Sequence, residues 1–219
     1  MRLSCRAPYV VALVALMIGP GVANAGAVIA SVDRATFQTA VSGGTITGQN
    51  FDSLVSGTIL GATPDLTYSA SGGSPIVTDT YLTSTSPNGL GSTSVGFFQP
   101  SETATFAFNS PITAFAIDVN TFATTDGSYT AALNTGDVVN SHYEVFPSFS
   151  TGQFIGFVSN TAFSNVTITS ITGFSYTLDT LIYGDAAAVA PGFGGVPEPT
   201  TLALLGIGLA GVGALRRRR

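Results

Sequence analysis

Few residues in this chain have side chains that catalysis commonly uses. His142 is its only histidine, and a Ser–His–Asp triad would also need a nucleophile on a strained turn, for which the G-x-S-x-G pattern is missing. One histidine does not complete the usual zinc ligand sets, and no H-E-x-x-H is present. Glu102 and Glu144 could hydrolyse a glycosidic bond as a pair, but no motif links them. We therefore expect a structural His142 and no enzyme.

Carboxylates could instead bind calcium, which takes oxygen ligands and needs neither histidine nor cysteine. Asn50-Phe51-Asp52 and Thr177-Leu178-Asp179-Thr180 resemble the early Phe-acid and late Leu-Asp motifs of jelly-roll carbohydrate-binding modules. The resemblance implies that Asp52 and Asp179 ligate a structural calcium. The family often has Glu at the early position and a second Asp or Asn where Thr180 stands. The alternative is that both aspartates are ordinary polar residues at strand ends.

Aromatic side chains are the residues on which a glycan could stack. Tryptophan, the commonest platform, is absent, which leaves Tyr81, Phe97, Phe98, Tyr129 and Tyr143. Adjacent residues of a strand point to opposite faces, so one of Phe97 and Phe98 should face the core and the other should not. The exposed ring could be a glycan platform or could lie under a loop, and the glycan-binding residues stay unassigned.

The charge of the chain argues against nucleic acid as a partner. Residues 26–196 contain one cation, Arg34, against eleven Asp and Glu, a net charge of −10. Binding nucleic acid phosphates requires cationic neutralisation, which this segment cannot supply. The single cysteine, Cys5, lies in the predicted leader described next, so the mature protein would have no disulfide and no cysteine metal site.

The first 25 residues have the three parts of a secretory signal peptide. Arg2 and Arg6 form a basic region, residues 9–18 form an apolar run, and Ala23 and Ala25 supply small residues at the cleavage positions. This run is too short for a stable membrane span. We expect cleavage after Ala25 and export across the inner membrane.

The last part of the sequence has a different three-part order. Val196-Pro197-Glu198-Pro199 comes first, and proline keeps such a stretch extended rather than helical. Residues 200–215 follow without a charge, and Arg216, Arg217, Arg218 and Arg219 come directly after them. Sixteen uncharged residues are marginal for a bilayer span. The four arginines should stop translocation and stay on the cytoplasmic side.

Together these parts resemble the PEP-CTERM sorting signal of Gram-negative bacteria. The resemblance covers about two dozen residues and implies recognition by an exosortase, a membrane-embedded cysteine transpeptidase. That enzyme would cut near the Pro-Glu-Pro and pass the protein to the cell envelope or extracellular matrix. The membrane anchor would then be transient and single-pass.

Between these two segments we expect one domain, residues 26–185, joined to the sorting segment 197–219 by a flexible linker, residues 186–196. A short helix should follow Asp33, which can cap it, and Gly43-Gly44 should end it.

Elsewhere the hydrophobic period is two: Ala104, Phe106 and Phe108 alternate with polar residues before Asn109-Ser110-Pro111 turns the chain. Val166 and Ile168, and then Phe174, Tyr176, Leu178 and Ile182, repeat this pattern. Short strands of this kind predict an all-β fold, a jelly-roll-like β-sandwich.

These observations favour an exported, non-enzymatic envelope or matrix protein with a structural or adhesive role. Its partners would be an exosortase and extracellular polysaccharide. The alternative is a carbohydrate-binding module with a structural calcium, and an envelope glycan hydrolase is the third possibility.

Overall fold

In the computed structural model, residues 30–81, 83–146 and 151–186 are described. The expected signal helix, membrane helix and nearly all of the linker lie outside these residues. The elements, in chain order, are β1 (Ala30–Ser31), α1 (Arg34–Ala40), β2 (Thr45–Gln49), β3 (Leu66–Ala70), β4 (Pro75–Thr78), β5 (Gly89–Ser92), β6 (Thr103–Asn120), β7 (Tyr129–Leu133), β8 (Val138–Asn140), β9 (His142–Val145), β10 (Thr151–Ser170) and β11 (Thr177–Asp185). Within the described ranges, no helix has the length and hydropathy needed to cross a bilayer.

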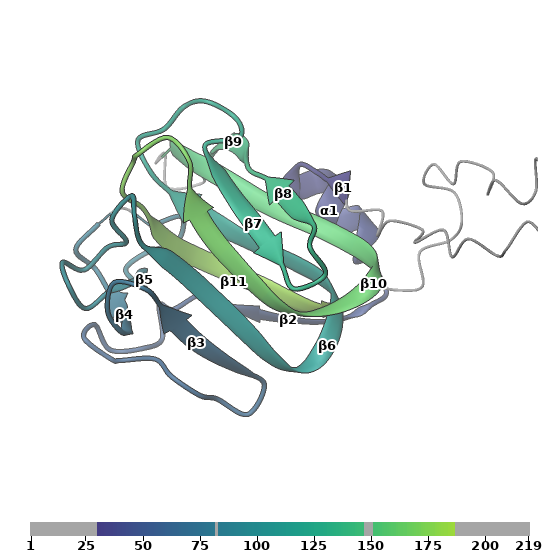
Figure 1. Ribbon diagram of the computed structural model, residues 1–219, viewed down its shortest axis with the longest axis horizontal. Coiled ribbons are helices and arrows are strands. Elements are labelled where there is room, and N and C mark those ends of the chain that lie inside the picture. The colour runs from purple at the N-terminus through teal and green to yellow at the C-terminus, as the bar shows by residue number, and fades with distance from the viewer. Residues whose placement is uncertain (1–29, 82, 147–150, 187–219) are drawn as a thin grey trace, which may run out of the picture.

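Two long antiparallel strands, β6 and β10, organise the whole domain. Their register runs from Gly152 opposite Asn120 to Thr169 opposite Thr103, with irregularities near the middle of both strands. All eleven strands join one open sheet, whose main path is β4-β5-β11-β6-β10-β7-β8. Figure 1 shows β10 curving round one side of the domain as it passes from one layer to the other.

The bend in β6 and β10 turns one sheet into two facing layers. The first half of β6 and the second half of β10 carry β3, β7 and β8 beside them. The other halves carry β1, β9, β11 and, through β11, β2 and β5. The prediction of an all-β, sandwich-like domain is confirmed, and its two layers are joined by continuous strands.

The core lies between the two layers and is mostly aromatic. Phe106 and Phe115, from the two halves of β6, pack with ring centroids 5.7 Å apart. Phe115 also contacts Phe157 of β10 at 5.6 Å, and all three rings are fully buried. Burying a side chain of this size contributes roughly 2–3 kcal/mol, so the bend is stabilised by the contacts that it creates.

Helix α1 forms where its capping residue and glycines predict a helix, and it covers the outer face of the layer that contains β11. Asp33 caps the helix by accepting from the Thr36 N–H at 2.9 Å, and Phe37 is buried. Phe37 packs edge-to-face on Phe154 of β10 at 5.9 Å. Gly156 makes this approach possible, because an added Cβ would meet the Phe154 ring at 2.3 Å.

One sequence expectation about β6 is wrong. Asn109-Ser110-Pro111 does not end a strand, because β6 continues through these residues. They are exposed and lie where the register between β6 and β10 shifts. A bulge leaves a backbone group unpaired, and proline, which has no N–H to donate, is tolerated at such a place.

The expected alternation along β11 also fails at two points. Phe174 precedes the strand and is 45% exposed, whereas Tyr176 and Leu178 are buried as predicted. A register shift between Asp179 and Ile182 then changes the phase of the strand. Beyond it Leu181 and Tyr183 face the core, while Ile182 packs with the α1 cluster. A bulge inserts one unpaired residue, so the side chains after it change face.

Candidate functional site

Arg34 at the start of α1 stands at the centre of a charged network. Its Nε donates to Glu144 Oε1 at 2.6 Å, and its Nη2 donates to Asp118 Oδ1 at 2.5 Å. The guanidinium also lies 4.5 Å from the centroid of the Phe154 ring. A planar guanidinium can satisfy two carboxylates and one aromatic face together. Arg34 thereby joins α1, β6, β9 and β10.

Asp118 is the buried member of this network, with a side chain only 3% exposed. Burial raises the pKa of Asp118 to about 6, although the nearby Arg34 charge opposes that shift. Removing a carboxylate from water disfavours its ionised form. Asp118 faces Asp179 directly in the register of β6 and β11. Two carboxylates therefore lie opposite each other on neighbouring strands, with Asp118 bound by Arg34 of α1 and Asp179 by the segment between β4 and β5.

The carboxylate of Asp179 accepts several protein hydrogen bonds. Its Oδ2 accepts from Ser84 Oγ at 3.1 Å and from the Thr85 N–H at 2.8 Å, and its Oδ1 accepts from the Thr180 N–H at 2.7 Å. Burial raises the pKa of Asp179, and the donor from Thr85 acts against this. Asp179 thereby fixes the segment between β4 and β5 to the sheet.

Asp52, the other predicted calcium ligand, contacts the same segment. Its Oδ1 accepts from the Asn88 N–H at 2.9 Å, four residues beyond Ser84. Both predicted ligands thus hold the connection between β4 and β5. Across the described ranges, no three His, Cys, Asp or Glu side chains come together as a metal-binding group. Calcium at Asp52 and Asp179 stays a prediction.

The residues considered for catalysis are in two places. His142 and Glu144 are on β9 and line an open depression of about 380 Å³ beside Arg34. Glu102 is buried elsewhere and accepts from Ser94 Oγ at 3.1 Å and the Gln99 N–H at 3.0 Å. Glu144 is bound by Arg34 and Glu102 by the loop before β6. Each carboxylate therefore already stabilises a local structure.

Three aromatic side chains gather on the surface, and we call Tyr81, Phe97 and Phe122 the rim cluster. The Tyr81 ring lies 5.7 Å from Phe97 and 5.4 Å from Phe122. Tyr81 and Phe97 are half-buried and Phe122 is 63% exposed. Phe98 is fully buried, so the expected division between the two neighbouring phenylalanines is confirmed.

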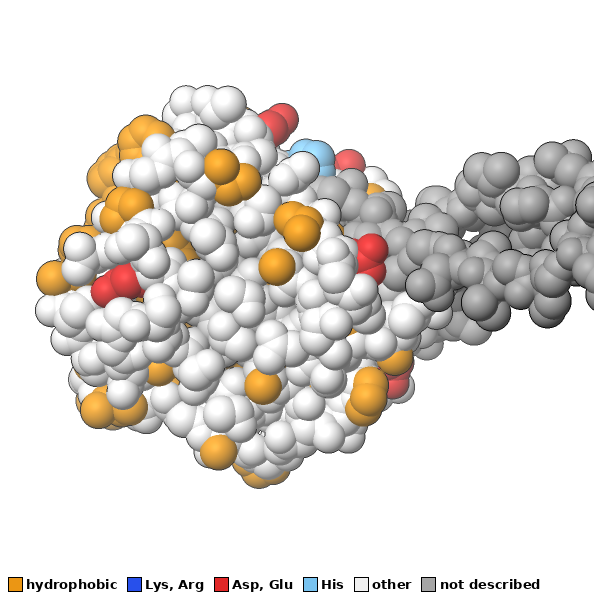
Figure 2. Space-filling view, in the orientation of Figure 1, with side chains coloured by type: hydrophobic (Ala, Val, Ile, Leu, Met, Phe, Trp, Pro, Cys, Tyr) orange, Lys and Arg blue, Asp and Glu red, His pale blue; other side chains and the backbone are white. Residues whose placement is uncertain are grey.

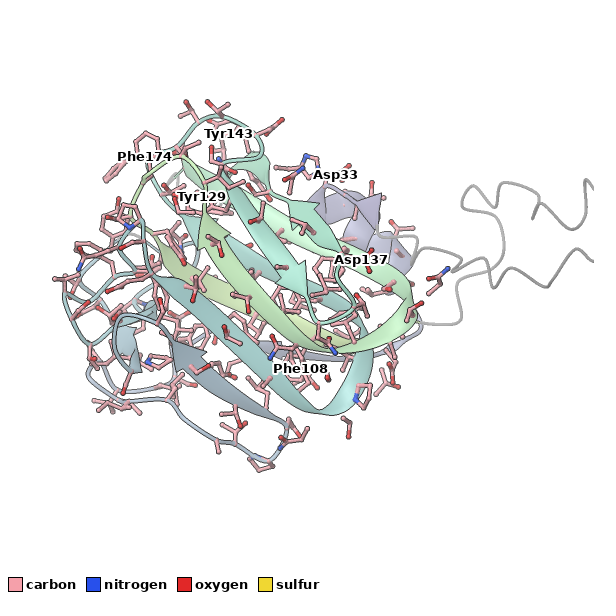
Figure 3. All side chains as sticks on the ribbon, viewed as in Figure 1. Asp33, Phe108, Tyr129, Asp137, Tyr143 and Phe174 are labelled. Carbon is pink, nitrogen blue, oxygen red and sulfur yellow. The ribbon has the colours of Figure 1, made fainter. Side chains whose placement is uncertain are left out.

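The rim cluster lies among the loops that join the layers at one end. Thr121 Oγ1 and the Tyr129 hydroxyl are 2.5 Å apart, and the same Oγ1 donates to the Ser175 carbonyl at 3.4 Å. The Tyr129 hydroxyl also donates to the Phe174 carbonyl at 3.5 Å. Figure 3 shows Tyr129 and Phe174 close together at this end. In Figure 2, apolar side chains gather along the same edge of an otherwise mostly uncharged face.

The remaining aromatic candidates do not join the rim cluster by direct ring contact. Tyr129 is fully buried, and its ring packs on Tyr176 at 5.2 Å. Tyr143 is 40% exposed and lines the depression beside Arg34. Phe122, the most exposed ring of the cluster, was not singled out from the sequence. The only signal that could have pointed to Phe122 was its position shortly after the end of a long strand.

Comparison with known proteins gives one specific match. Residues 195–219 match the family model of the PEP-CTERM protein-sorting motif. No curated protein matches the chain. Among solved structures, the chain has a weak likeness to the catalytic domain of a GH87 alpha-1,3-glucanase in complex with tetrasaccharides, with 14% identity and a TM-score of 0.37. The likeness covers 63% of this chain and 31% of that one, so the chain spans about a third of that domain's length.

The family match falls on the residues predicted for sorting, Val196, Pro197, Glu198 and Pro199, and on the four arginines 216–219. These residues, like Ala23 and Ala25, lie outside the described part of the structure. The motif implies export, transient membrane anchoring and processing by exosortase, a membrane enzyme. The chain is an exported protein that carries the PEP-CTERM protein-sorting motif at residues 195–219.

Proposed function

We propose that the domain formed by residues 26–185 is a non-enzymatic structural or adhesive module of the cell envelope or extracellular matrix. The observation that carries this proposal is the Arg34 network. The single cation of residues 26–196 binds Asp118 and Glu144 and fastens α1 and β9 to the sheet. Arg34 and Glu144, two of the charged groups that line the depression, are thereby used for structure.

The surface chemistry supports a role in a hydrated polymer. Backbone and uncharged polar side chains cover most of the face in Figure 2, with hydrophobic side chains and a few acidic ones scattered over it. A net negative, lysine-free surface stays soluble and repels other acidic chains. Such a domain suits a hydrated matrix, in which it must remain soluble after release from the membrane.

A retention experiment tests the proposed function. The gene is deleted in a matrix-producing host and restored with the full chain, and the protein is located by fractionation of cells, matrix and medium. We expect the protein in the matrix fraction and a measurable loss of matrix cohesion in the deletion strain. Protein found only in the medium would contradict the adhesive role, and release of reducing sugar from matrix polysaccharide would contradict the non-enzymatic role.

A carbohydrate-binding module with a structural calcium is the second candidate, favoured by the exposed rim cluster. Calcium at Asp52 and Asp179 would cross-link β11 with the segment that follows β2. Binding to the native state alone raises stability by mass action, so calcium should raise the melting temperature where magnesium does not. Asp52→Asn should remove the rise and Asp137→Asn, on an exposed turn, should keep it. Equal melting curves with and without calcium would exclude the calcium part.

A further inference from the structure

The rim cluster is an aromatic surface that the core does not require. Phe122 is 63% exposed, yet both of its neighbours, Thr121 and Ala123, are buried. The Ala123 N–H donates to Thr121 Oγ1 at 3.2 Å, which fixes the backbone on both sides of Phe122. The ring is therefore presented outward by a well-held backbone.

The other two rings are also held by buried neighbours. Phe97 precedes Phe98, whose N–H donates to the Tyr176 carbonyl at 2.8 Å, and the Tyr176 N–H donates back at 3.0 Å. Gly96 allows Tyr81 to approach Phe97, because its φ is +83° and an added Cβ would meet Thr80 Oγ1 at 2.7 Å. A binding surface held in one arrangement loses less entropy when a ligand binds.

Resting on the adhesive function proposed above, we infer that the rim cluster binds a neutral polysaccharide through Tyr81, Phe97 and Phe122. Aromatic faces are electron-rich and their edges electron-poor, so the ring faces attract the weakly positive C–H groups on the apolar side of a sugar ring. Phe122 offers the most exposed face, and the Tyr81 ring, in contact with both phenylalanines, fixes their spacing.

Charge distinguishes a neutral glycan from an anionic one. Asp79, two residues before Tyr81, and Asp126, four residues after Phe122, are exposed acidic side chains, whereas Asp118, four residues before Phe122, is buried. Arg34, the only Lys or Arg in residues 26–196, is bound by Asp118 and Glu144. A uronic acid or sulfated polymer would meet like charge here and would find no cation to offset it.

The size of the surface distinguishes a glycan from a protein partner. Phe122 is 63% exposed and Tyr81 and Phe97 are half-buried, so the three rings present only part of the up to about 250 Å² that each could bury, less than the roughly 500 Å² that one partner contributes to a small specific protein interface. A specific protein interface buries more than roughly 1,000 Å² in total with an apolar centre. Thr80, Thr124 and Thr125, which are exposed and lie within three residues of Tyr81 or Phe122 in the sequence, could supply the hydroxyls that sugar recognition uses.

Affinity electrophoresis tests this inference. The full chain, purified in a mild nonionic detergent, is run through native gels containing dextran, laminarin, hydroxyethyl cellulose or alginate. We expect retardation by at least one of the three neutral polymers and none by alginate. Absence of retardation in all three neutral gels, or stronger retardation in alginate, would overturn the inference.

Matched variants assign the binding to the cluster. Phe122→Ala should weaken the apparent affinity about three- to tenfold, and Phe122→Tyr should keep it within about twofold because the ring remains. Val138→Ala is the control, since Val138 is 62% exposed and follows Asp137, far from Phe174 in Figure 3. Equal affinity of wild type and Phe122→Ala, with unchanged melting temperatures, would contradict the assignment. Wild-type dimers that become monomers in Phe122→Ala would also contradict it, because the cluster would then be a contact between two copies of the chain.

The same variants separate this inference from the proposed function. If Phe122→Ala remains in the matrix fraction as wild type does, the adhesive function stands. The rim cluster is then not the surface that binds the polysaccharide. If wild type itself is absent from the matrix fraction, the adhesive function is wrong whatever the gels show.

Discussion

Arg34 and Asp118 form an ion pair across 84 residues of sequence, with Nη2 and Oδ1 2.5 Å apart. Asp118 is nearly inaccessible to solvent, and Arg34 shares its guanidinium with Glu144. Breaking one side of a buried pair leaves an uncompensated charge, which costs far more than an exposed pair contributes. The position of α1 on the sheet therefore depends on Arg34.

Replacing Arg34 by alanine should lower the free energy of unfolding by about 3–5 kcal/mol, because Asp118 loses its cationic partner while staying buried. Chemical denaturation followed by circular dichroism measures this loss. Arg34→Lys keeps the charge without the forked geometry and should lose less. An alanine variant as stable as wild type would show that the network adds nothing to the fold.

Asp118 should make stability depend on pH. Its folded-state pKa of about 6 lies above the unfolded value of 3.8. Between these values the native state holds a proton that the unfolded chain has released, so stability falls as pH rises. The contribution is up to about 3 kcal/mol between pH 4 and pH 7.

Denaturation of Asp118→Asn at several pH values checks this. The variant should show a smaller decline in stability from pH 4 to pH 7 than wild type, because asparagine does not titrate. Asp137→Asn, on an exposed turn, should leave the decline as it is. Identical pH profiles for wild type and Asp118→Asn would refute the coupling.

Gly184 should tolerate alanine much less than Gly173 does. Both glycines have positive φ, 144° and 79°, so alanine is strained at each. At Gly184 an added Cβ would also lie 2.1 Å from the Thr45 carbonyl oxygen of β2, whereas at Gly173 nothing lies within 4 Å. Gly184→Ala should cost roughly 1–3 kcal/mol more because of this overlap. Thermal melts of both variants measure the difference, and equal losses would contradict it.

Processing by exosortase should depend on the Pro-Glu-Pro stretch. Replacing Pro197, Glu198 and Pro199 together by alanine allows helix to extend through the recognition site. With exosortase present, mass spectrometry should find wild type without Arg219 and the variant with its full length. Asp185→Ala, outside the motif, should be processed as wild type. A processed triple variant would show that other residues direct the cut.

The predictability of the fold differs from element to element. Helix α1 was predictable because Asp33, Phe37 and Gly43-Gly44 act within one short stretch, where capping and periodicity are local. The strands were predictable from alternation, but the continuity of β6 through Pro111 was not. A proline signals a turn or a bulge equally well, and only the register with β10 selects the bulge.

In the candidate sites, single residues were recognisable from the sequence, whereas their partners were not. Tyr81 and Phe97 were recognisable as aromatic candidates, and Asp179 as a polar residue on the last strand. The partners of these residues lie far along the chain: Ser84 for Asp179, and Phe122 for Tyr81. Such contacts depend on how the loops of a bent sheet meet at one end.

The sequence by itself determined the sorting motif at residues 195–219 and the all-β character of the domain, because both are patterns of neighbouring residues. The tertiary structure alone decided that Arg34 binds Asp118 and Glu144 and that three rings meet at the surface. These contacts join residues that the chain keeps far apart, and the bend of β6 and β10 fixes where those residues meet.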